Sequence, residues 1–195
     1  MKGERAKMMA DAFQRIFIGL LLVLLDFRLQ YVDILPDFIG YILVFRALGT
    51  LAGQHSYFLK ARPFTLTLIF LSLTSLVVTP GMNLLEDPPS SQDLGWSLLG
   101  QVLIVLDLFM LYWLCKGIGE LAMQRELKQL QEKAEYRWKF YFLATAVMLV
   151  YTPFSINVEP AFNLVMFPLV ILLFSAMILL LGLVRMARKE LVDEG

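Results

Sequence analysis

Long apolar runs dominate the whole chain, and they are broken only by short clusters of charged residues, prolines and glycines. A helix that crosses a bilayer needs about 20 mostly apolar residues. Six windows of roughly that length fit between the breaks. They cover residues 13–32, 36–53, 63–79, 95–115, 138–152 and 160–184. The pattern therefore predicts an all-α polytopic membrane protein, in which residues 1–195 form a single transmembrane domain of six helices arranged as three hairpins.

Composition points the same way and restricts the chemistry. Hydrophobic residues make up 58% of the chain and charged residues 17%, against about 45–50% and about 25% in soluble domains. The lipid bilayer is thus the expected partner, and a nucleic acid is not. The single Cys115 and the single His55 do not supply a usual zinc or iron–sulfur ligand set, so neither a metal nor another cofactor is expected.

The distribution of charge predicts the orientation. The net charge is zero, but 15 of the 17 basic residues fall on one predicted side: at the amino end up to Arg15, between the second and third spans, in the connector 116–137 together with Lys139, or after the last span. The opposite loops hold seven acidic residues and one arginine. By the positive-inside rule, both termini are expected to be cytoplasmic.

The connector is the only long polar stretch. Within it, residues 120–139 alternate in charge sign, with apolar residues loosely spaced for one helical face. We expect a solvated extension of the fourth helix along the membrane surface. A docking site for a cytoplasmic partner is the alternative.

Two charged residues fall deep inside predicted spans, where a charge costs about 2.5–3.5 kcal/mol. Arg46 follows Pro36 by ten residues and Asp107 follows Gly95 by twelve, which places both near the midplane at 1.5 Å per residue. We expect them to pair or to share a water-filled pocket. Such a pair could be a structural staple or part of a substrate or ion pathway.

Four further charged residues lie at the predicted outer end of the first two helices. They are Asp26, Arg28, Asp33 and Asp37. Asp26 and Arg28 could pair at the interface, reach the surface through a tilted helix, or face a hydrated cavity. Asp33 could cap the second helix, and Asp37 complements the positive end of that helix. With Arg46 and Asp107 these residues are the candidate ligand-binding set, and no catalytic residue is assigned.

The run from Asp33 to Tyr41 is the most distinctive in the chain. It reads Asp-Ile-Leu-Pro-Asp-Phe-Ile-Gly-Tyr. Pro36 suits the first turn of a helix, and Gly40 removes a side chain where a neighbouring helix could come close. The Ile-Leu-Pro-Asp-Phe-Ile-Gly-Tyr segment resembles the hallmark of a group of small multi-spanning membrane proteins of Gram-positive bacteria. The resemblance covers about the first 60 residues and implies a bacterial plasma-membrane location, without implying an activity.

Three classes of function are compatible with these features. A component that binds or transports a small molecule or ion, with its polar site open to the extracellular side, would use the candidate set above. A membrane subunit that stabilises or regulates a partner would use residues 120–139. An intramembrane lipid-modifying enzyme could use Asp107 or Asp26 as a general base beside an arginine, but no nucleophile or metal set accompanies them.

Overall fold

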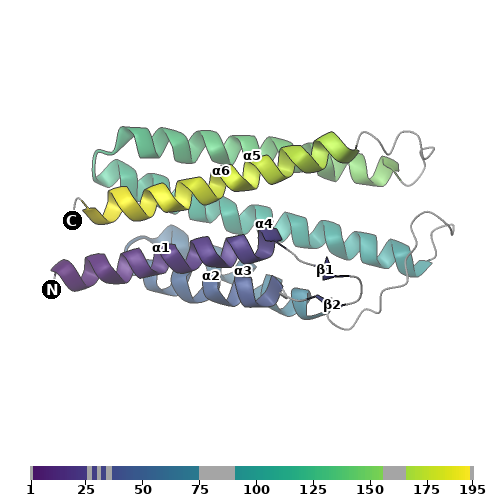
Figure 1. Ribbon diagram of the computed structural model, residues 1–195, viewed down its shortest axis with the longest axis horizontal. Helices are drawn as coiled ribbons and strands as arrows, with labels where there is room; N and C mark the ends of the chain where they lie inside the picture. The colour runs from purple at the N-terminus through teal and green to yellow at the C-terminus, as the bar shows by residue number, and fades with distance from the viewer. Residues whose placement is uncertain are drawn as a thin grey trace.

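A computed structural model describes residues 2–25, 28–29, 32–33, 37–74, 91–155 and 166–193. The described residues form six helices and one pair of very short strands (Figure 1). Strand β1 (Arg28–Leu29) pairs antiparallel with β2 (Val32–Asp33). The helices are α1 (Lys2–Leu25), α2 (Asp37–Leu51), α3 (Ser56–Thr74), α4 (Ser91–Gln124), α5 (Lys128–Ser155) and α6 (Met166–Asp193).

The helices form a closed ring. Each packs on its neighbours in the chain, and α6 packs on α1 to complete the circle. Successive helices run in opposite directions, so that the two chain ends lie at the same end of the bundle (Figure 1). We call this end the terminal end and the opposite one the far end. In this order α2 and α5 stand on opposite sides of the ring, a fact that matters for the site below.

Helical periodicity explains the core. In α1 the fully buried residues Phe13, Ile16 and Leu20 recur at intervals of three and four, which places them on one face. The other helices contribute buried residues in the same way. The largest of these are Leu48, Leu51, Phe58, Leu68, Met110, Leu111, Leu114, Ile118 and Leu130.

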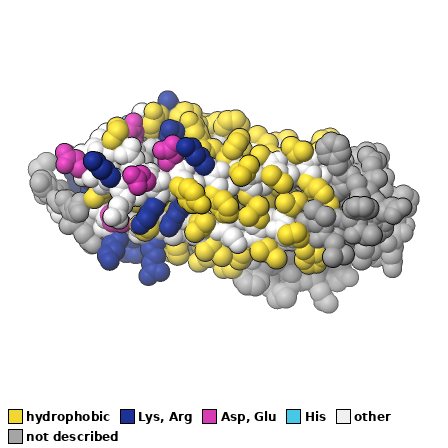
Figure 2. Space-filling model, turned by 90° about the horizontal axis from the view of Figure 1, so that it is seen from above, with side chains coloured by type: hydrophobic (Ala, Val, Ile, Leu, Met, Phe, Trp, Pro, Cys, Tyr) yellow, Lys and Arg dark blue, Asp and Glu magenta, His cyan; other side chains and the backbone are white. Residues whose placement is uncertain are grey.

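Three helices are long and apolar enough to cross a membrane. The qualifying stretches are Gly3–Leu25 in α1, Leu98–Gln124 in α4 and Phe167–Val192 in α6. The described charged side chains gather towards the terminal end, whereas apolar side chains cover the middle of the face shown in Figure 2. The expected all-helical fold is therefore confirmed, with three helices that are long and apolar enough to cross a membrane.

Two glycines set the contact between α1 and α2. A Cβ built on Gly19 would lie 2.5 Å from the carbonyl oxygen of Gly40, and one on Gly40 would lie 2.6 Å from that of Gly19. No side chain fits between the backbones, so the helices touch through their main chains. The expectation that Gly40 allows a close neighbour is confirmed, and Gly19 is its counterpart.

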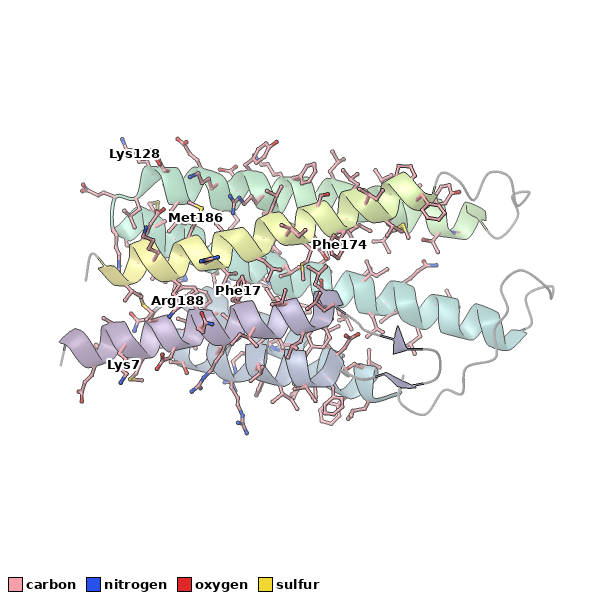
Figure 3. The ribbon with its side chains drawn as sticks, in the orientation of Figure 1. Lys7, Phe17, Lys128, Phe174, Met186 and Arg188 are labelled. Atoms are coloured by element: carbon pink, nitrogen blue, oxygen red, sulfur yellow. The ribbon has the colours of Figure 1, made fainter. Side chains whose placement is uncertain are left out.

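Arginines tie the helices together at the terminal end. Arg125 donates a hydrogen bond to the Leu191 carbonyl, and Arg137 donates one to the Leu179 carbonyl at 2.7 Å. Arg188 of α6, which points towards α1 in Figure 3, donates to Gln14 Oε1 at 2.7 Å. These bonds link α6 to both of its neighbours and so hold the ring closed.

Several helix boundaries differ from those predicted. The first helix ends at Leu25 rather than at residue 32, and the residues that follow include the β1–β2 pair. The third begins at Ser56, ahead of its internal Pro63. Hydropathy reports where a segment is apolar and not where a helix begins or ends, so at the terminal end α1, α3, α4 and α5 extend through polar residues beyond the apolar windows. Pro168 falls in the first turn of α6, where its missing N–H costs nothing.

The connector 116–137 is not an extension lying along a surface. Helix α4 continues to Gln124, and α5 begins at Lys128 after a tight turn in which Leu127 N–H bonds to the Ala122 carbonyl and Glu126 has φ 59°. This is a helix-ending turn of the Schellman type, with glutamate in the left-handed position that usually holds glycine. Three apolar residues of the connector, Leu121, Leu130 and Ala134, are buried and face inward, whereas Met123 and Tyr136 are exposed.

Candidate functional site

A cluster of polar side chains lies inside the ring, around Asp107 of α4. The Tyr141 hydroxyl of α5 donates a hydrogen bond to Asp107 Oδ2 at 2.8 Å. The Tyr41 hydroxyl of α2 is close enough to interact with the same carboxylate. Both tyrosines are buried. Since α2 and α5 stand on opposite sides of the ring, their tyrosines can reach one carboxylate only through its interior.

Two polar atoms of this cluster make no close hydrogen bond. Within the described part of the chain, these are the buried Asp107 Oδ1 and Thr145 Oγ1. Thr145 follows Tyr141 by one turn of α5 and interacts with its hydroxyl, as Asp107 does with the hydroxyl of Tyr41, but at longer range than the bond between Tyr141 and Asp107 Oδ2. A buried polar atom without a hydrogen bond costs about 1–3 kcal/mol. Two of them beside one tyrosine indicate a place for a bound ion or water.

Helix periodicity brings Asp37 towards the same region. It is the first residue of α2 and precedes Tyr41 by four positions, so the two share a face. Asp37 is half-buried and within electrostatic reach of the Tyr41 hydroxyl. The run that stands out in the sequence thus serves two purposes, because Gly40 fits against α1 while Asp37 and Tyr41 face the cluster.

The expected pairing of Arg46 with Asp107 is wrong. The Arg46 side chain is exposed, whereas Asp107 turns to the tyrosines. Arg46 is five residues from Tyr41, which corresponds to about 140° around the helix. It also lies only about 8 Å from the end of α2, close to the height of Arg62 in α3. Counting residues gave an approximate depth, but it could not give the direction in which the side chain points.

The remaining candidates contribute less. Asp26 lies outside the described residues. For Arg28 and Asp33 only the backbone is described, and their Cα atoms are opposite each other in the β1–β2 pair. The structure therefore brings Asp107 and Asp37 towards one site and removes Arg46 from it.

Sequence reasoning missed the two tyrosines and the threonine. Tyr41 had a usable signal, because it stands one helical turn after Asp37 in the distinctive run. Tyr141 and Thr145 had none, since a tyrosine or a threonine in an apolar span has many ordinary roles. Their significance depends on where α5 stands relative to α2 and α4.

The composition of the cluster restricts what it can hold. It offers one carboxylate and several hydroxyls, and nowhere in the described residues do three His, Cys, Asp or Glu side chains come together as a metal site would require. A carboxylate alone can balance one positive charge. Comparisons with family models, with curated proteins and with solved structures find no match for this chain, so its function must be inferred from this geometry.

Proposed function

We propose that all six helices cross a bacterial plasma membrane, with both termini in the cytoplasm. The directions in which the helices run support this proposal. Helix α4 ends at the terminal end and α6 begins at the far end (Figure 1), so α5 must cross between them if both of those helices span. Likewise α1 runs away from the terminal end and α4 begins at the far end (Figure 1). Helices α2 and α3, packed between them, run back to the terminal end and away from it again.

The orientation follows from the charges. Lys7, Lys128 and Arg188 all lie towards the terminal end, whereas Phe174 lies nearer the middle of the bundle (Figure 3). Exposed apolar side chains also continue along helices other than α1, α4 and α6, which hold the three long apolar stretches. They include Leu66, Phe70 and Leu73 on α3 and Phe142, Leu143, Val147 and Val150 on α5. A basic end next to an apolar band is the pattern of a cytoplasmic membrane boundary.

Within this arrangement the protein binds a singly charged cation at the Asp107 cluster, as a binding or transport component. The observation that carries the proposal is the buried Asp107 Oδ1, which makes no close hydrogen bond to a described residue. A carboxylate at membrane depth is costly unless a positive charge or a proton accompanies it. Arg46 does not supply that charge, so a proton, an alkali-metal ion or ammonium does.

The geometry fits such an ion. Tyr141 occupies Oδ2, which leaves Oδ1 and the Thr145 hydroxyl as oxygen ligands, and hard cations prefer oxygen. Asp107 precedes Lys116 by nine residues, about 14 Å along α4. This is close to half the thickness of a hydrocarbon core of about 30 Å. Residues at that depth commonly form ion pathways and proton relays.

The alternatives have weaker support. A partner that docks on residues 120–139 would need apolar residues to contact there, but Leu121, Leu130 and Ala134 are buried in the bundle. An enzymatic role would need a reactive partner for Asp107, and the hydroxyl groups nearest to it belong to buried tyrosines.

Thermal unfolding of the full-length chain in detergent tests the proposal. Lithium, sodium, potassium and ammonium chloride are compared with choline chloride at constant ionic strength and over a wide pH range. A cation at 100 times its Kd stabilises a folded protein by about 2.7 kcal/mol. The wild type should gain stability with one of these ions or with falling pH, and Asp107→Asn should lose that response.

Glu132→Gln is the matched control, because Glu132 is an exposed carboxylate near the terminal end. It should respond as the wild type does. A wild type that responds to no cation and no pH change, or an Asp107→Asn variant that responds equally, would refute the proposal. Cation flux into liposomes containing the wild type or Asp107→Asn then distinguishes transport from binding alone.

A further inference from the structure

A second site lies outside the ring interior, in a cleft at the terminal end. The cleft has a volume of about 370 Å³ and lies between α4 and α5, with Tyr57 of α3 at one side. Its size is within the range of about 300–1,000 Å³ that is typical of ligand pockets. It is separate from the Asp107 cluster, because Asp107, Tyr41 and Tyr141 are not among its lining residues.

Small residues account for the hollow. Gly119 of α4 faces Ala134 of α5, and a Cβ built on Gly119 would lie 3.9 Å from the Ala134 Cβ. A methyl group would fit there without strain, but a larger side chain would extend into the cleft. The space thus depends on two positions where each helix carries almost no side chain.

The cleft holds charges of both signs. Lys139 Nζ lies 2.7 Å from Glu135 Oε1, and this contact lowers the pKa of Glu135. Lys116 and Glu120 also line the cleft. Lys116 lies within electrostatic reach of Glu135, but among the described residues neither Lys116 nor Glu120 makes a salt bridge. They are one helical turn apart on α4, so an ammonium group and a carboxylate face the same space.

Aromatic side chains place the cleft at a membrane boundary. Rings follow one another from Tyr57 through Trp113 and Tyr112 to Trp138, with centroids 4.9–5.5 Å apart. Such aromatic belts favour the interface between headgroups and hydrocarbon. The next ring after Trp138 is Phe142, which is exposed. The polar cleft therefore continues into the apolar outer surface.

We propose that this cleft binds the headgroup of a phospholipid that carries both a phosphate and a primary ammonium group, as phosphatidylethanolamine does. Lys116 binds the phosphate and Glu120 binds the ammonium group, while the acyl chains follow the apolar surface beginning at Phe142. The aromatic rings also favour a cation, since Lys60 Nζ already lies 4.7 Å from the Trp113 ring and 5.0 Å from the Tyr57 ring. A lipid with only a negative headgroup would meet Glu120 without compensation.

Native mass spectrometry of the full chain, released from an equal mixture of phosphatidylethanolamine, phosphatidylglycerol and phosphatidylcholine, tests this assignment. The wild type should retain phosphatidylethanolamine roughly tenfold over the other two, a preference of about 1.4 kcal/mol, because only its headgroup makes both charge-assisted hydrogen bonds. Phosphatidylcholine lacks N–H donors for Glu120, and phosphatidylglycerol lacks the cation.

The variants separate the two contacts. Lys116→Gln should weaken retention of all three lipids, whereas Glu120→Gln should remove the preference and raise retention of phosphatidylglycerol. Gly119→Leu should fill the cleft and abolish retention. Lys128→Gln and Glu132→Gln change exposed charges that do not line the cleft and should behave as the wild type.

Three outcomes would overturn the proposal. The first is equal retention of the three lipids by the wild type, and the second is retention that Lys116→Gln and Glu120→Gln leave unchanged. The third is displacement by soluble phosphoethanolamine at the concentration at which the lipid itself binds, which would assign the site to a soluble molecule. If Gly119→Leu fails to fold, the two charge variants still decide, because Lys116 and Glu120 are at least partly exposed.

Discussion

The contact between α1 and α2 and the contact between α4 and α5 use opposite means to join two helices. At the first, Gly19 and Gly40 bring the backbones together, and no room for a side chain remains. At the second, the Tyr141–Asp107 hydrogen bond crosses between the helices, and a cleft opens nearer the terminal end. The difference shows that one chain can join its helices in two ways. Close steric packing holds α1 against α2, whereas polar groups occupy the space between α4 and α5.

The largest expected effect comes from filling the glycine contact. Gly40→Val places a branched side chain where even a Cβ lies 2.6 Å from a backbone oxygen. Because neither main chain can move away alone, we expect a loss of about 3 kcal/mol or more, or no folded protein. Thermal unfolding and yield in detergent measure it. Gly100→Ala is the control, since nothing lies within 4 Å of its Cβ position. Equal stability of the two variants would contradict the close contact.

A smaller effect is expected at the hydrogen bond between α4 and α5. Tyr141→Phe removes the donor to Asp107 Oδ2 while keeping the ring, and hydrogen bonds to charged groups contribute about 1.5–3 kcal/mol. Denaturant unfolding should show a loss of about 2 kcal/mol. Tyr136→Phe removes a hydroxyl from an exposed tyrosine on the same helix and should cost nothing measurable. If Tyr141→Phe leaves the free energy of unfolding unchanged, the hydrogen bond does not stabilise the contact between α4 and α5.

Thr145→Val tests whether the second unpartnered atom is reserved for a ligand. The substitution keeps the volume and removes the buried Oγ1, so without a bound cation it should stabilise the protein by about 1 kcal/mol. At saturating cation the gain should shrink or reverse, because a ligand oxygen is lost. Unfolding with and without the cation measures both effects. If Thr145→Val raises the free energy of unfolding equally with and without the cation, Thr145 is not part of the proposed cation site.

The smallest effect is expected outside the cluster, at the exposed ion pair of Glu135 and Lys139. Glu135→Gln should leave thermal stability unchanged within error, because solvent screens exposed pairs. Any residual difference from the wild type should fade as the pH falls through the lowered pKa of Glu135, since both forms are then uncharged there. A clear drop in stability at neutral pH would show that the pair contributes more than its exposure suggests.

The sequence predicted the helices well and their facing directions poorly. Apolar windows located all six helices, and Gly40 was recognised as a point of close approach. Counting residues placed both Arg46 and Asp107 deep in the membrane. Such counting estimates the depth of a residue along the helix axis, but it does not give the direction in which the side chain points around that axis. Tyr141 and Thr145 acquire meaning only when α5 stands across the ring from α2, and long-range arrangement of that kind has no local signature.

Closure of the ring by α6 has a consequence for the order of assembly. The chain is made from α1 onwards, and the contact that completes the circle joins the last helix to the first. If the helices assemble in chain order, the ring closes and the polar cluster around Asp107 is enclosed only when α6 packs on α1.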